Sequence, residues 1–160
     1  MVFACFYGWK KGPIYALPRD FESAKHGYSA NSYITALEDC LLSVYLPGMI
    51  FMQDNAKIHK AKKTMAWFAA NGILLVDWPP YSPDLNPIEH LWNDLKALVY
   101  EIRPDIERVK GGEDAIRLAL WEALEEAWER IPEERLLGLI NSMHDRMQAV
   151  INAEGWYTRY

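Results

Sequence analysis

The hydrophobic positions form short clusters at the start of the chain and helical repeats further on. Aromatic and β-branched residues fill 2–9 and 13–17, on either side of a Lys-Lys-Gly turn signal at 10–12, which predicts a β-hairpin. A polar, loop-like stretch follows. Apolar residues then recur every three or four positions, which predicts a helix over 31–46, ended by Pro47 and Gly48.

Two apolar runs without alternation come next, at 49–52 and 73–76. Such runs are typical of strands buried on both faces. A helix is expected over 57–70 between them, which completes a strand–helix–strand unit. Side chains that follow the first strand of such a unit emerge at the edge of the sheet.

The helical pattern is strongest after Pro87. Two more amphipathic helices are expected after Pro104, one spanning 116–128 and one that opens at Pro132. The apolar face of the helix after Pro87 carries Ile88, Leu91, Trp92, Leu95, Leu98, Val99 and Ile102. The expected fold class is therefore α/β, with a core over 1–102 and a C-terminal helical extension over 103–160 packed on it.

The composition of the chain excludes several classes of protein. The chain has 160 residues and is 51% hydrophobic, which fits one domain with a sizeable core and excludes disorder for most of its length. The longest apolar stretch is too short to cross a membrane, and Cys5 and Cys40 form no metal or disulfide pattern. Residues 1–100 carry no net charge and 101–160 carry −5, so the acidity does not exclude a local basic patch near the N-terminal core.

Two carboxylates are candidates for metal chemistry. Asp54 follows an expected buried strand, and Glu89 lies in the first turn of the helix after Pro87, with 34 residues between them. That separation matches one strand–helix–strand unit, which returns the chain to the same edge of the sheet. Two converging carboxylates can share divalent cations with phosphate oxygens, as in two-metal phosphodiester sites.

Structural roles for the same residues remain open. Glu89 also fits a helix start at 86–89, with Asn as cap and Glu as part of a capping box. Asp54 also fits a turn, and His59 also fits a hydrogen-bonded structural histidine. A run of lysines beside Asp54 fits either a solvated helix face or contacts to nucleic-acid phosphates. These are Lys57, Lys60, Lys62 and Lys63.

Two segments together resemble a known family. They are Met-Gln-Asp-Asn-Ala at 52–56, with His59, and Trp-Pro-Pro-Tyr-Ser-Pro-Asp-Leu-Asn-Pro-Ile-Glu at 78–89, followed by Leu-Trp at 91–92. They resemble the catalytic domain of mariner-type transposases, which are DDE enzymes with a ribonuclease-H-like fold. The 34-residue spacing is similar to the family's DD34E pattern, and the ending at 155–160 is similar to that of fungal members.

The resemblance implies a function and a site. It implies a mixed sheet flanked by helices, and Asp54 and Glu89 as the second and third catalytic carboxylates, both ligands of two Mg²⁺ (or Mn²⁺) ions. It implies cleavage of transposon-end DNA by water and strand transfer into target DNA, in the nucleus and with a possible homo-oligomer. It implies that the protein neither binds a membrane nor acts on a small-molecule substrate. The residues expected to contact DNA are Lys57, His59, Lys60, Lys62, Lys63 and Lys96.

One departure from the family pattern concerns the first catalytic aspartate, which the family carries on a strand ahead of the hairpin. The acids upstream of Asp54 lie in an expected loop or helix and in no apolar strand; they are Asp20, Glu22, Glu38 and Asp39. We therefore expect the chain to lack the first strand, its carboxylate and the family's N-terminal helix-turn-helix. We also expect that it does not cleave DNA alone and that it is marginally stable, because sheet edges are left unpaired. The alternative function is a non-catalytic remnant that binds DNA or a full-length transposase.

Overall fold

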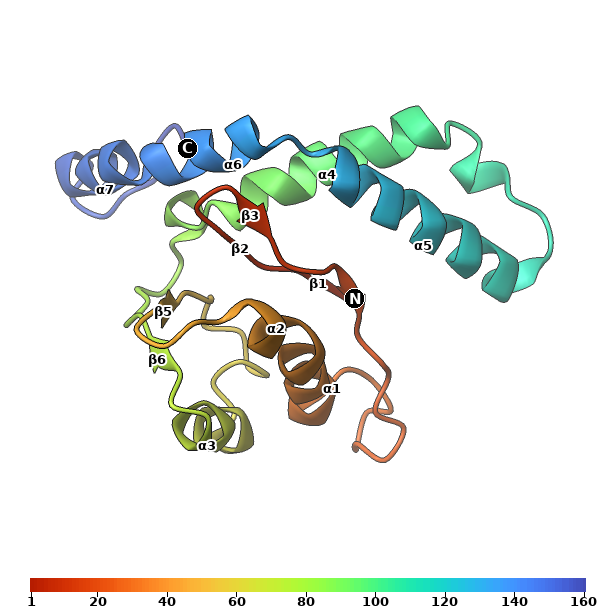
Figure 1. The fold of residues 1–160 in the computed structure, drawn as a ribbon, viewed down its shortest axis with the longest axis horizontal. Coiled ribbons are helices and arrows are strands. Elements are labelled where there is room, and N and C mark those ends of the chain that lie inside the picture. The colour runs from red at the N-terminus through yellow and green to blue at the C-terminus, as the bar shows by residue number, and fades with distance from the viewer. The chain divides into compact units, whose positions relative to one another are not determined.

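The computed structural model describes residues 1–160, which divide into two compact units (Figure 1). Unit 1 comprises Met1–Phe6 and Lys11–Asn86, and unit 2 comprises Tyr7–Lys10 and Pro87–Tyr160. The helix that begins after Pro87 therefore groups with the C-terminal helices by its contacts. The division predicted from the sequence, into a core over 1–102 and an extension over 103–160, stays a prediction.

The first half of the chain begins with four short strands, which are followed by helical segments and two further short strands. In order they are β1 (Val2–Phe3), β2 (Phe6–Tyr7), β3 (Lys10–Lys11), β4 (Tyr15–Ala16), α1 (Ala30–Ala36), a π-helical turn (Leu37–Leu41), α2 (Leu42–Val44), β5 (Ile50–Phe51), α3 (Lys62–Ala70), β6 (Leu74–Leu75) and a 3₁₀ turn (Pro83–Leu85). The second half holds α4 (Ile88–Ile102), a 3₁₀ turn (Ile106–Arg108), α5 (Gly112–Arg130), α6 (Glu133–Asn141) and α7 (Met143–Asn152). The predicted mixed α/β class is confirmed.

The N-terminal hairpin is confirmed, but its turn lies elsewhere. β1 pairs antiparallel with β4, in the register Val2 to Ala16. Inside this pair, β2 pairs with β3, so the predicted turn residues 10–12 instead include strand β3. The turn lies at Gly8 and Trp9, because Gly8 adopts a φ of +53°, which glycine reaches without the steric cost that a Cβ imposes.

The predicted strand–helix–strand unit is confirmed as β5–α3–β6. β5 and β6 pair in parallel, in the register Ile50 to Leu74. The expectation that both strands are buried on both faces is wrong, since Ile50 is 62% and Leu74 is 55% exposed. Their neighbours Phe51 and Leu75 pack against the core of unit 1, so only one residue of each strand is directed to that core. The sheet is present as three two-stranded pieces rather than one continuous sheet.

Residues 30–44 form the predicted helix, with a π-helical turn at its centre. Tyr33, Leu37 and Leu41 lie on its buried face, as their helical spacing predicts. They pack with Phe68 of α3 and Ile73 beside β6 into the hydrophobic core of unit 1. This core supports the loop that follows β5.

Helix α3 begins at Lys62, five residues later than predicted. Two hydrogen bonds explain the late start: Ala56 N donates to Asp54 Oδ1, and the Ala56 carbonyl accepts from His59 N. An aspartate side chain that bonds the backbone two residues on competes with helix formation. The lysines at 57 and 60 therefore lie in a loop and not on the helix.

Unit 2 is built from the strongly periodic helices. Leu91, Leu95 and Val99 of α4 are buried, as predicted, and α4 packs against α5. Trp92 of α4 stacks on Trp128 of α5 with ring centroids 6.4 Å apart. The predicted single helix after Pro132 is two helices, α6 and α7, because residue 142 forms a turn between them. Six acidic residues in the second half of α5 and the start of α6 are exposed: Glu122, Glu125, Glu126, Glu129, Glu133 and Glu134.

Two glycine substitutions are expected to change stability in opposite directions. A Cβ at Gly12 would lie 2.6 Å from Cys5 Sγ, so Gly12→Ala is expected to cost about 1–3 kcal/mol through overpacking. Gly138 lies inside α6 with open space around it, so Gly138→Ala is expected to add about 0.5–1 kcal/mol through helix propensity. Urea unfolding followed by circular dichroism measures both changes. A stable Gly12→Ala variant would contradict the close approach of the two hairpin strands.

Candidate metal and nucleic-acid site

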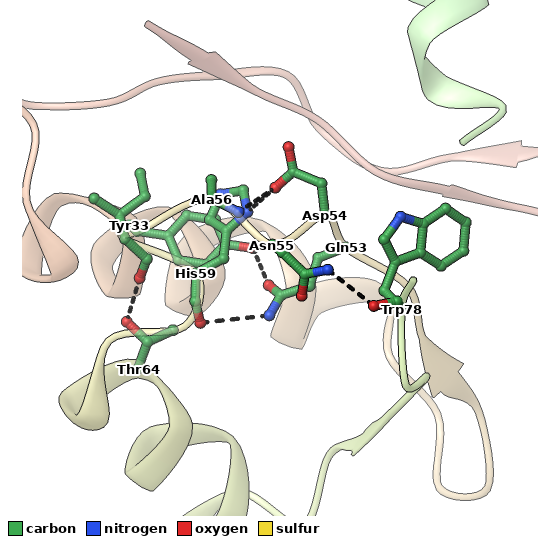
Figure 2. Close-up of polar contacts among 9 residues, drawn as sticks. Tyr33, Gln53, Asp54, Asn55, Ala56, His59, Thr64 and Trp78 are labelled. Carbon is green, nitrogen blue, oxygen red and sulfur yellow. Dashed lines mark hydrogen bonds and ion pairs between the residues drawn. The ribbon is translucent and has the colours of Figure 1, made fainter. Parts of the chain in front are cut away.

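Asp54 lies in the loop directly after β5, and its two carboxylate oxygens have different surroundings (Figure 2). Oδ1 accepts from Ala56 N at 3.0 Å and lies 2.6 Å from His59 Nδ1. Oδ2 makes no hydrogen bond within the chain, and the side chain is 52% exposed. One oxygen of Asp54 is thus held by the protein, and the other is available to a ligand.

The neighbours of Asp54 are ordered by the buried core. Tyr33 is 2% exposed, and its ring lies against that of His59 with centroids 4.2 Å apart. The Tyr33 hydroxyl donates to Gln53 Oε1 at 2.7 Å. Burial, with a smaller contribution from the charge of Asp54, raises the pKa of Tyr33, so the phenol stays a neutral donor.

Asn55 belongs to the motif at 52–56, but the sequence analysis assigned it no role in the site. Its Nδ2 donates to the carbonyl of Trp78 at 2.8 Å, which joins the loop after β5 to the loop after β6 (Figure 2). The available signal was the polar run at 53–55 immediately after an apolar strand. Gln53 and Tyr33 belong to the same group, and no sequence spacing links Tyr33 to it.

Glu89 lies in the first turn of α4, as predicted, and its side chain is exposed. The helix begins at Ile88 with Pro87 as its cap residue, one position later than the capping-box interpretation requires. Asp54 belongs to unit 1 and Glu89 to unit 2. Their convergence on one metal site therefore stays a prediction.

The start of α4 is held to the C-terminal helix α7 within unit 2. Arg146 of α7 is 3% exposed, and its Nη1 lies 2.9 Å from Nε2 of His90. Arg146 Nε donates to Ser142 Oγ, and the guanidinium lies over the ring of Tyr160. Burial, with the nearby charge of Arg146, lowers the pKa of His90, which favours the neutral ring.

Most of the predicted DNA-contacting cations lie in the exposed part of unit 1. Lys57, Lys60 and Lys62 are exposed and form no hydrogen bond or ion pair. Lys63 is exposed and donates to Asn31 Oδ1 at 2.5 Å. Lys96 is exposed on α4, in unit 2. Three cations within eight positions of Asp54 along the chain are therefore available to an anionic partner.

The donor set at Asp54 suits a hard cation that takes most of its ligands from elsewhere. A single exposed carboxylate oxygen is the kind of ligand that Mg²⁺ uses, since this ion usually binds one or two carboxylates and fills its shell with water and phosphate oxygens. The chain contains no group of three or more His, Cys, Asp or Glu side chains that could hold a metal ion. The exposed oxygen of Asp54 therefore fits a divalent cation that takes its other ligands from elsewhere.

The acids upstream of Asp54 have structural surroundings. Asp20 accepts from Ser29 Oγ at 2.5 Å and from Asn31 Nδ2 at 2.9 Å. Glu38 accepts from Trp67 Nε1 at 3.0 Å, and Asp39 hydrogen-bonds Tyr15. Glu22 is exposed in the loop ahead of α1. As expected, these acids lie in a loop or a helix and not in a strand.

Replacing Ser29 by Ala is expected to destabilise unit 1 and to change the titration of Asp20. Ser29 caps α1 through a capping box with Ser32, and loss of such a cap costs about 1 kcal/mol. The hydrogen bond from Ser29 is the largest cause that lowers the pKa of Asp20 below its usual 3.8. That pKa is therefore expected to rise in Ser29→Ala.

The sign of the resulting pH dependence is fixed by the lowered pKa of Asp20. The ionised Asp20 stabilises the fold above its unfolded pKa of 3.8, and this contribution is lost as the pH falls through the lower folded pKa. In Ser29→Ala, the part of the folding stability that is lost on acidification through Asp20 is expected to be smaller. Carbon NMR of the Asp20 carboxyl and thermal melts at decreasing pH measure both effects. An unchanged pKa of Asp20 would show that the Ser29 contact is absent in solution.

No helix of the chain combines the length and the hydrophobicity that a bilayer crossing requires.

Comparisons with known proteins identify the family of the chain. The family model described as DDE superfamily endonuclease matches residues 19–110, a range that includes Asp54 and Glu89. The transposable element Tc1 transposase of Caenorhabditis elegans is 36% identical over 160 residues, which cover 100% of this chain and 54% of the relative. The transposable element Tc3 transposase of the same organism is 39% identical over 108 residues, which cover 66% of this chain and 30% of the relative.

A third relative, the transposable element Tcb2 transposase of Caenorhabditis briggsae, is 31% identical over 168 residues, with 100% of this chain and 54% of the relative covered. The chain thus spans about half the length of the curated relatives it matches. Because the family model matches more than half of the chain, the protein belongs to the DDE superfamily endonucleases, and its relatives are Tc1-type transposases.

Proposed function

We propose that this chain supplies the metal-binding and DNA-binding part of a DDE transposase. Such an enzyme cleaves transposon-end phosphodiesters with water and then joins the freed 3′-hydroxyl to target DNA. The observation that carries the proposal is the family match over residues 19–110, which spans Asp54, Glu89 and the lysine run between them.

In this proposal Asp54 and Glu89 are the catalytic carboxylates and hold Mg²⁺ or Mn²⁺ in a two-ion site. Bound ions of this kind activate the attacking water and stabilise the leaving oxygen of a phosphodiester. Asp54 contributes its outer oxygen, Oδ2, while Ala56 N and His59 hold Oδ1 in place. Because Asn55 ties this loop to the loop after β6, the carboxylate starts from a fixed position.

The exposed cations contact the DNA backbone in this proposal. Lys57, Lys60 and Lys62 bind phosphates, and Lys63 joins them when its contact to Asn31 opens. Lys96 and the Nε2 atom of His59 are the remaining proposed DNA contacts. A DNA substrate places the activity in the nucleus, and pairing of two transposon ends is the reason to expect a homo-oligomer.

A second candidate function is a DNA-binding or protein-interaction module without catalysis. It is favoured by the lack of any group of three or more metal-ligating side chains in the chain, together with the exposed lysines. The transposase proposal predicts that a divalent cation and DNA bind cooperatively, because both contact the same metal site. The non-catalytic module has no such site and predicts independent binding.

The experiment that separates the candidates measures binding of a fluorescent DNA duplex with and without Mn²⁺. If Asp54 and DNA phosphates share the ion, Mn²⁺ is expected to raise the DNA affinity about tenfold, and DNA to raise the Mn²⁺ affinity equally. Nicking of supercoiled plasmid in Mn²⁺ that is lost in Asp54→Asn would show catalysis by the chain itself. DNA binding that is indifferent to Mn²⁺ favours the non-catalytic module. No DNA binding at all contradicts the transposase proposal and the DNA-binding form of the second candidate.

The lysines near Asp54 provide a separate prediction. Changing Lys57, Lys60 and Lys62 to Gln together is expected to weaken DNA binding at least about tenfold and to lower the slope of log affinity against log salt by about 3. Fluorescence anisotropy at several salt concentrations measures both quantities. The matched control changes Lys10, Lys25 and Lys110 to Gln, which removes the same charge elsewhere. Equal losses in the two variants would mean that net charge alone controls binding.

A further inference from the structure

His59 has two ring nitrogens, and the structure gives them different surroundings. Nδ1 lies 2.6 Å from Asp54 Oδ1, whereas Nε2 makes no hydrogen bond within the chain. A carboxylate only accepts hydrogen bonds, so Nδ1 must carry the proton of this contact. The ring therefore acts on Asp54 through one defined atom.

The ring of His59 is itself held in place by residues of the core. Tyr33 lies against it at a centroid distance of 4.2 Å and an interplanar angle of 34°, and Tyr33 is almost fully buried in the core. The Tyr33 hydroxyl donates to Gln53 Oε1, and Gln53 Nε2 donates to the backbone carbonyl of His59 at 3.5 Å. The histidine is thus positioned by the core and not by solvent (Figure 2).

The loop around Asp54 is closed on itself by backbone contacts. His59 N donates to the Ala56 carbonyl at 2.9 Å, and Thr64 Oγ1 donates to the Ile58 carbonyl at 2.7 Å. Thr64 is fully buried in α3. The loop that carries both Asp54 and His59 is therefore anchored at the start of the helix that follows.

We propose that His59 is a positioning residue for Asp54: its Nδ1–H holds Oδ1 so that Oδ2 alone is presented to a divalent cation. The inference rests on the proposed function, since it assigns a role in the same metal site. It gives the histidine a role beyond the DNA contact expected from its place in the lysine run. Residues that orient a metal ligand in this way typically contribute about 10–100-fold to metal affinity.

The test uses three substitutions of His59 that separate its two nitrogens. His59→Ala removes both, His59→Asn places an amide N–H near the position of Nδ1, and His59→Gln places one near the position of Nε2. Mn²⁺ binding to the full chain, followed by the electron paramagnetic resonance of free Mn²⁺, is expected to weaken about 10–100-fold in His59→Ala. His59→Asn is expected to restore most of the affinity, and His59→Gln is not.

Two outcomes of the binding measurement would overturn the inference. One is an affinity in His59→Ala equal to that of the unmodified chain, and the other is rescue by His59→Gln but not by His59→Asn. A thermal melt of each variant identifies a loss that comes from unfolding, because a purely structural histidine would lower the melting temperature without rescue by one particular amide.

A metal-free measurement keeps this inference separate from the proposed function. Nitrogen NMR of His59 at fixed alkaline pH is expected to show the Nδ1–H tautomer in the unmodified chain and a shift toward Nε2–H in Asp54→Ala. If Mn²⁺ binds equally well to the unmodified chain and Asp54→Ala, the proposed function fails, and the tautomer then decides whether His59 holds Asp54. An Nε2–H tautomer in the unmodified chain overturns the inference, whatever Mn²⁺ affinity is measured.

Discussion

Replacing Asp54 by Asn is expected to weaken Mn²⁺ binding by at least about 100-fold. This loss is larger than the one expected when a residue that only orients a metal ligand is removed. Asn keeps the shape of the side chain, and its amide can still contact Ala56 N or His59. The charge and one ligand oxygen are lost, and a hard cation depends on both. Titration of Mn²⁺ with detection by electron paramagnetic resonance measures the change.

The matched control for Asp54→Asn is Asp114→Asn. Asp114 is an exposed carboxylate in the first turn of α5, outside the predicted site, and its replacement removes the same charge. Mn²⁺ affinity is expected to be unchanged in the control. If the two variants bind Mn²⁺ alike, Asp54 is a turn residue and its exposed oxygen holds no ion.

Replacing Trp128 by Ala is expected to cost unit 2 about 3–5 kcal/mol, the range for a large aromatic residue in a core. Trp128 is 1% exposed, and its stacking on Trp92 adds a smaller contribution. Domains of this size are stable by only about 5–15 kcal/mol, so the variant is expected to lose much of the helical signal at low urea concentration. Circular dichroism during urea unfolding measures the loss.

A second tryptophan provides the control for Trp128→Ala. Trp156 is 74% exposed near the C-terminus, and Trp156→Ala is expected to change the free energy of unfolding by less than about 0.5 kcal/mol. Similar losses in both variants would mean that the packing of α4 on α5 is not what stabilises unit 2.

Periodicity predicted the elements well where one apolar face decides the structure. The helix after Pro87 follows from its repeat, and Leu91, Leu95 and Val99 are buried as that repeat requires. The parallel pairing of β5 with β6 follows from two apolar runs separated by a helix. In both cases the local pattern and the packing favour the same structure.

The errors occurred where side chains compete with the backbone or where packing determines burial. The late start of α3 depends on Asp54 accepting from Ala56 N, a contact that a helical repeat does not reveal. The exposure of Ile50 and Leu74 depends on which elements cover the strand pair, and a run of apolar residues carries no such information.

The sequence by itself determined the family of this protein, the order of its main helices and the position of Asp54 after a strand, because motif identity and hydrophobic spacing are local properties of the chain. Only the tertiary structure decided that Oδ1 of Asp54 is bound and Oδ2 is available, and that Tyr33 supports His59, which lies twenty-six positions later. Contacts between residues so far apart arise when the core brings α1 against the loop after β5, and no spacing along the chain encodes the resulting geometry.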